Sequence, residues 1–173
     1  MAHMVKYLKD GSIHAAPTVT RPVKAKAHMS PPDIMLVSAL LNMRYSGPLK
    51  RELPPGARHA IKPGGTFTDE TRLFITDFQH SSSQLHADGN ISPLPIGRTD
   101  DELFKYTIFN LYNDVRALSA FQGDIDAENT VLNALKSLPH LHNLDAMVLD
   151  LPSISPESAG AGGLGIESFP GSP

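Results

Sequence analysis

The segment from residue 64 to residue 95 constrains the fold more than any other part of the sequence, because it holds one well-marked helix followed by a turn. Thr68 precedes the acidic pair Asp69-Glu70, which is typical of a helix N-terminus, where a hydroxyl caps free backbone N–H groups. The helix pattern ends in Phe78-Gln79, and Asp88-Gly89 follows a polar connector. We therefore expect a short amphipathic helix that is followed closely by a turn requiring glycine.

Two more stretches predict helices with an apolar face. Ser30 followed by Pro31 is a typical helix start, and apolar residues recur after it at helical spacing. The pair Thr99 and Glu102 forms a capping box, and we expect it to begin the longest helix of the chain, ending near Gly123.

The sequence of the C-terminal third predicts two more helices followed by a flexible tail. One helix is expected to begin at Asp124 or Asp126 and to close at Pro139, and a short one is expected within residues 140–149. From Leu151 onward serine, glycine and proline dominate, and such a segment cannot bury enough apolar surface to order itself.

The N-terminal stretch predicts a β-hairpin. Asp10-Gly11 lies between two short runs of weakly alternating polarity, and both central positions of a tight hairpin turn favour such residues. Residues 17–28 are expected to be an extended tether of mildly basic character. Met1 to His3 precede a second methionine and are left out of the expected fold.

Together these patterns predict an all-α fold, a small helical bundle with extra C-terminal helices and an N-terminal β-hairpin. Four regions are expected: a hairpin and tether over residues 1–30, a helical domain over 31–118, a helical extension over 119–150, and a flexible tail over 151–173.

Within residues 31–118 the sequence resembles the bacterial peptidoglycan-binding domain, the three-helix module attached to many cell-wall hydrolases. The residues that carry the resemblance are Gly65, Phe67, Thr71, Ile75, Phe78-Gln79, Leu85, Asp88-Gly89, Ile91 and Pro93, preceded by Val37, Leu40, Leu41 and Asn42. The chain departs from the family pattern where Gly64 replaces an aspartate and Gln84 replaces a glycine. The loop over residues 49–65 is also longer than is usual in the family.

The resemblance implies a shallow groove for the wall polymer beside the second turn and one face of the second helix. The polar candidates there are Arg72, Gln79, Gln84, Asp88 and Asn90, with Tyr45 or Tyr112 as a stacking surface. Arg58 lies in the basic loop before the helix, where we expect it to meet anionic groups such as muropeptide carboxylates. A solvated or turn-forming role is the simpler explanation for each of these side chains, and the absence of tryptophan weakens a sugar-stacking mechanism.

Other classes of function lack the residues they need. The net charge of −3 provides no basic footprint for nucleic acid, and the absence of cysteine removes thiolate sites. No apolar run approaches the roughly 20 residues of a membrane span, and no apolar core of a signal peptide precedes the hairpin. We therefore expect a protein that is cytoplasmic as synthesised and that reaches the wall by a non-classical route.

Catalysis and cofactor chemistry also lack a pattern. The eight histidines include no His-x3-His pair with a carboxylate partner, so no metal site is expected, and nothing indicates another cofactor. Asp100-Asp101-Glu102 is better explained as helix-capping acid than as a catalytic carboxylate pair. We therefore expect a protein that is not an enzyme.

Two functions remain as hypotheses. The first is a peptidoglycan-binding module that targets itself or a partner to the cell wall, in phage lysis or contractile secretion. The second is a helical adaptor that uses the same scaffold to bind a protein through its tail or its helical extension, without binding the wall.

Overall fold

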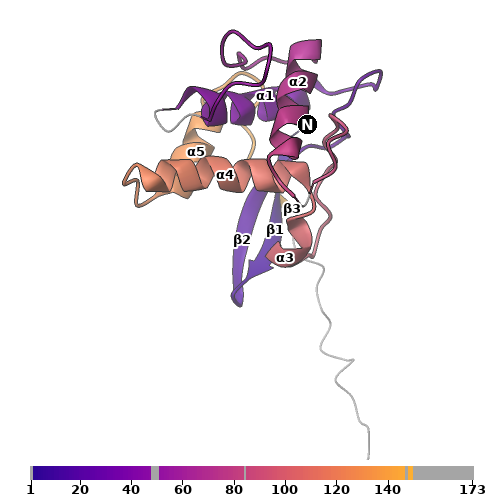
Figure 1. Cartoon of the computed structure of the whole chain (residues 1–173). Coiled ribbons are helices and arrows are strands. Elements are labelled where there is room, and N and C mark those ends of the chain that lie inside the picture. The colour runs from indigo at the N-terminus through magenta and orange to yellow at the C-terminus, as the bar shows by residue number, and fades with distance from the viewer. Residues whose placement is uncertain (1, 48–50, 84, 147, 150–173) are drawn as a thin grey trace, which may run out of the picture.

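The computed structural model describes residues 2–47, 51–83, 85–146 and 148–149, and these residues form a mixed α/β fold (Figure 1). The elements in chain order are β1 (His3–Lys9), β2 (Ser12–Thr18), α1 (Pro31–Ser46), α2 (Asp69–His80), α3 (Asp100–Leu103), α4 (Thr107–Phe121), α5 (Ala127–Lys136) and β3 (Val148–Leu149). The strands form one sheet in the order β2-β1-β3. The expected all-α fold is therefore wrong.

The hairpin expected around Asp10-Gly11 is present, and it belongs to the domain. β1 and β2 pair antiparallel from His3↔Thr18 to Lys9↔Ser12. The backbone φ angles of 49° at Asp10 and 75° at Gly11 fit the left-handed positions of a tight hairpin turn. Ala2 and His3, which the sequence analysis left out of the fold, are only 2% and 7% exposed.

α1 is buried along much of its length, because the tether, α2 and α4 all pack against it. Its helix was predicted from Ser30-Pro31, and residues 33–41 are buried without interruption. The carboxylate of Asp33 is fully buried and accepts hydrogen bonds from the backbone N–H groups of Thr20 (3.0 Å) and Arg21 (3.2 Å). This pair of bonds fixes the tether to the helix, so the hairpin is held against the same core.

The single long helix expected from Asp100 is wrong, because the chain breaks it into α3 and α4 at residues 104–106. The side chain of Asn110 donates to the backbone carbonyls of Phe104 and Tyr106, which supplies partners at the break. α3 also meets the sheet, where the N–H of Leu8 donates to the carbonyl of Arg98 (3.2 Å). In Figure 1 the hairpin and α3 lie on one side of α4, and α1 and α2 lie on the other.

The C-terminal elements complete this core. α5 was predicted and packs on α4, with Val131 and Leu135 buried. The short helix expected within residues 140–149 is wrong. Turns there bury Leu141 and Leu144, and Val148 then pairs with Met4 in parallel. The tail expected over residues 151–173 lies outside the described residues.

Candidate functional site

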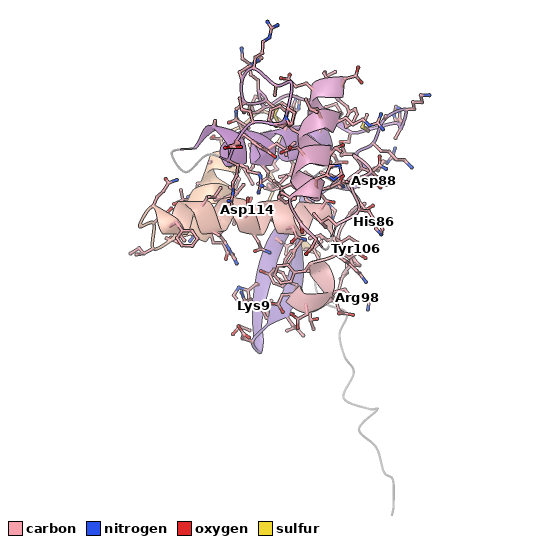
Figure 2. All side chains as sticks on the ribbon, in the orientation of Figure 1. Lys9, His86, Asp88, Arg98, Tyr106 and Asp114 are labelled. Carbon is pink, nitrogen blue, oxygen red and sulfur yellow. The ribbon has the colours of Figure 1, made fainter. Side chains whose placement is uncertain are left out.

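A cleft of ≈ 460 Å³ opens between the C-terminal end of α2, the turn at Asp88 and the N-terminal end of α4. Figure 2 shows His86, Asp88 and Tyr106 on the same side of α2. The lining residues are Gln79, His86, Asp88, Asn90, Ser92, Lys105, Tyr106 and Thr107. We call this space the Asp88 cleft.

The floor of the Asp88 cleft is built on the side chain of Gln79, which is 2% exposed. Its Oε1 accepts the backbone N–H of Gly89 (2.8 Å), and its Nε2 donates to the carbonyl of Asn90 (2.8 Å). The same Nε2 lies 3.0 Å from Thr107 Oγ1 and 3.2 Å from Asp88 Oδ1. Gln79 therefore joins α2, the turn and the start of α4 at one point.

The turn itself requires glycine and a close approach to α2. Gly89 has a φ of +71°, in the left-handed region where a Cβ is disfavoured. A Cβ built there would lie 2.9 Å from Cγ of Arg72 and 3.0 Å from Oγ1 of Thr76. The backbone of the turn thus packs directly on the exposed side of α2.

Asp88 is the fixed negative charge of the cleft. Burial alone would raise its pKa, but hydrogen bonds from Asn90 and Gln79 outweigh burial and hold the pKa below its usual range. The backbone N–H of Asn90 donates to Asp88 Oδ1 at 2.8 Å. The carboxylate is therefore ionised at neutral pH and can accept hydrogen bonds from a ligand.

The opposite wall comes from the break between α3 and α4. Lys105 is exposed, and its Nζ lies 5.7 Å from the centre of the half-buried Tyr106 ring. Thr107 is the first residue of α4 and connects this wall to Gln79. The cleft thus combines an anion, a cation and an aromatic ring within one hollow.

The tether and the hairpin hold the far end of the turn in place. Val23 and Ile91 exchange two backbone hydrogen bonds of 2.8 and 2.9 Å, and Ile91 is fully buried. The buried hydroxyl of Thr18 accepts the backbone N–H of Leu94 (2.8 Å). The N-terminal elements therefore help to position the cleft.

The structure brings four of the predicted site residues together. Gln79, Asp88 and Asn90 meet in the hydrogen-bond network of the turn, and Arg72 lies beside it against Gly89. Arg58 is exposed and lines a separate hollow with His59 and Arg51, away from the turn.

The other predicted site residues do not form part of the Asp88 cleft. Tyr45 and Tyr112 are 1% and 0% exposed, so neither ring offers a stacking surface. The hydroxyl of Tyr45 donates to Asp77 (2.7 Å), and Tyr112 packs in the core beside Arg116. Gln84 lies outside the described residues.

Sequence reasoning missed His86, Ser92, Lys105, Tyr106 and Thr107. His86 and Ser92 flank the predicted turn, so their proximity to it in sequence was a usable signal. Lys105 and Tyr106 had been placed within a continuous helix, and only the break after α3 turns them toward the cleft.

The chemistry available in the cleft is binding through hydrogen bonds and charge. Among the described residues, no group of three or more histidines and acidic residues is arranged to hold a metal ion. No helix in the described part of the chain is both long and apolar enough to cross a membrane.

No protein-family model matches this chain, and comparisons with curated proteins and with solved structures give no significant match. The function must therefore be argued from the cleft and from the residues around it.

Proposed function

We propose that this protein is a non-catalytic binding module for peptidoglycan and that the Asp88 cleft is its binding groove. The observation that carries the proposal is the network around Gln79, which gathers Asp88, Gly89 and Asn90 into the floor of a polar cleft. These residues, apart from Asn90, are among those that carry the family resemblance. The Asp88 cleft is next to α2 and the turn at Asp88, which is where the resemblance implies a groove, and this supports the proposal.

The lining suits the chemistry of a muropeptide. Asp88 offers an anionic acceptor for hydroxyl, amide and ammonium donors, whereas Lys105 offers a cation for a carboxylate. Tyr106 supplies an aromatic surface where tryptophan is absent. A cleft of ≈ 460 Å³ also falls within the usual range for small-molecule sites.

Retention on purified sacculi tests this proposal. Ser92→Trp fills the cleft from an exposed position, and Ser12→Trp places the same indole on the exposed end of β2 as a matched control. We expect the wild type and Ser12→Trp to be retained equally and Ser92→Trp to bind about tenfold more weakly, a loss of about 1.4 kcal/mol. Far-UV circular dichroism should report the same fold for all three. Failure of the wild type to bind sacculi would refute the function, and unchanged binding by Ser92→Trp would refute the site.

A second function, a protein-binding adaptor, is favoured by one separate observation. Phe121 and Ile125 are 81% and 104% exposed around the turn that joins α4 to α5. Exposed apolar side chains that form a contiguous patch mark interaction surfaces, and these two are close to each other in the sequence. Light scattering distinguishes the two functions. A stable dimer or hetero-complex that Phe121→Ser dissolves would support the adaptor, and a monomer that binds sacculi would contradict it.

A further inference from the structure

A second and larger cleft, of ≈ 820 Å³, lies on the other side of α2 from the Asp88 cleft. It opens between the C-terminal ends of α1 and α2, the loop after residue 51 and the first half of α4. Figure 2 shows Asp114 on one side of α2, with Asp88 and His86 on the other. We call this space the Asp114 cleft.

The floor of the Asp114 cleft contains a buried charge. The guanidinium of Arg44, a residue 5% exposed, pairs with Asp114, donates to Ser81 Oγ (3.1 Å) and lies 4.6 Å from the centre of the Phe78 ring. Burial lowers the pKa of Arg44, and its Nε is left without a hydrogen-bond partner.

Such a partly buried ion pair is weak evidence for stability, because apolar residues of similar size often stabilise a fold as well or better. The role of Arg44 is instead to position its partners. It holds the carboxylate of Asp114 and the hydroxyl of Ser81 in fixed places at the floor of a cleft.

The remaining lining offers both donors and acceptors. Arg51 is 56% exposed and approaches the second oxygen of Asp114 only to 3.6 Å, so most of its hydrogen-bonding capacity faces solvent. Ser82 and Ser83 add hydroxyls, and the half-buried ring of Phe104 adds an apolar surface. This combination fits a saccharide rich in hydroxyl and amide groups that carries a carboxylate for Arg51.

The two clefts share a narrow ridge. Phe78 lines the Asp114 cleft, while the next residue, Gln79, lines the Asp88 cleft. The break between α3 and α4 also contributes to both clefts, because Phe104 lines the Asp114 cleft whereas Lys105 and Tyr106 line the Asp88 cleft. Because consecutive Cα atoms are about 3.8 Å apart, the same short segments form a wall of both clefts.

We propose that the Asp114 cleft is a second saccharide subsite, and that both clefts bind neighbouring units of one polymer strand. The identity of the polymer, peptidoglycan, rests on the proposed function. Once one cleft has bound, the linked unit reaches the other at a high effective concentration, and a chain of several units then binds more tightly than a single unit.

Isothermal titration with two soluble peptidoglycan fragments tests this subsite. One fragment is a single disaccharide-peptide, and the other is a strand of several such units. Ser83→Trp blocks the Asp114 cleft from an exposed position, and Arg51→Gln removes its exposed cation. Arg98→Gln makes the same change of side chain at a 53% exposed arginine that lines neither cleft.

We expect the wild type and Arg98→Gln to bind the long fragment about tenfold or more tightly than the short one. Ser83→Trp and Arg51→Gln should reduce that ratio of affinities to the number of units in the long fragment, because only the Asp88 cleft then binds and each unit offers it one equivalent site. An undiminished ratio in Ser83→Trp, or no length dependence in the wild type, would overturn the subsite and leave the proposed function standing. Absence of binding to either fragment by the wild type would overturn both.

Discussion

Replacement of Gln79 provides a direct test of how the Asp88 turn is held, because this one buried side chain joins α2 to both the turn and the start of α4. Gln79→Leu keeps a side chain of similar size and removes every hydrogen bond. Gln79→Glu keeps the acceptor for the N–H of Gly89 but replaces the donor Nε2 with an oxygen. That oxygen would face Asp88 Oδ1 and the carbonyl of Asn90, at the present 3.2 and 2.8 Å.

The expected loss in the free energy of unfolding follows from the polar groups that Gln79→Leu leaves without hydrogen-bond partners. In Gln79→Leu the buried N–H of Gly89 loses its acceptor, which costs about 1–3 kcal/mol. The carbonyl of Asn90 and the hydroxyl of Thr107 each lose a donor, at about 0.5–1.5 kcal/mol apiece. We therefore expect the free energy of unfolding to fall by about 3 kcal/mol, a large part of the stability of a domain this size.

Gln79→Glu adds a pH dependence whose sign can be worked out. Burial and the neighbouring Asp88 raise the pKa of the introduced carboxyl above its ordinary value of about 4.3. The variant is therefore most stable below that value and loses stability as pH rises through the raised pKa. In the wild type Asp88 acts oppositely. Its lowered pKa gives a contribution that is present at neutral pH and is lost as pH falls.

Urea unfolding followed by far-UV circular dichroism at several pH values measures both effects. Gln122→Leu, the same substitution at an exposed position just after α4, serves as the control and should change stability by less than about 0.5 kcal/mol. A loss below about 1 kcal/mol in Gln79→Leu would refute the account of the turn. The account would also be refuted if the free energy of unfolding of Gln79→Glu, compared with that of the wild type, did not rise as the pH falls.

Two further outcomes follow from the structure. Gly89→Ala should destabilise the protein more than Gly123→Ala in urea unfolding. Both glycines have positive φ, where adding a Cβ costs about 1–2 kcal/mol, but only at Gly89 would the Cβ also meet Arg72 and Thr76. Equal losses would contradict the close packing of the turn on α2. Burial raises the pKa of Tyr7, Tyr45 and Tyr112, so the unfolded chain releases these protons first and stability should fall as pH rises above about 10. The phenolate absorbance of these three tyrosines should therefore rise in the same transition as the change in circular dichroism, and ionisation of all three in a folded protein would show that the rings are accessible.

The parts of the fold that local chemistry determines could be predicted from the sequence. Capping residues and the spacing of apolar side chains located α1, α2 and the start of α3, and Asp10-Gly11 located the hairpin turn. Whether that hairpin belongs to the core depends on tertiary contacts, such as the bonds from the tether to Asp33. The break at residues 104–106 was hidden because apolar residues keep helical spacing across it, and the side chain of Asn110 stabilises it by donating to the carbonyls of Phe104 and Tyr106.

The residues of the candidate site were also predictable only where they are close to one another in the sequence. Gln79, Asp88 and Asn90 were found because a turn and the helix before it are close in sequence as well as in space. Lys105 and Tyr106 reach the cleft only through the helix break, which no local pattern indicated. A buried tyrosine and a surface tyrosine have the same sequence signal, and Tyr45 and Tyr112 were therefore assigned to the groove although they lie in the core.

The pairing of β1 with β3 has a consequence for folding during synthesis. β1 is made before the other described elements and can pair with β2 early, but its parallel partner at residues 148–149 follows only after α1 to α5 have emerged from the ribosome. Until then the edge of β1 at Met4 and Val5 has no strand beside it, and exposed strand edges favour pairing with other chains. Truncated or stalled chains that end before β3 are therefore expected to be more prone to aggregation than the complete domain.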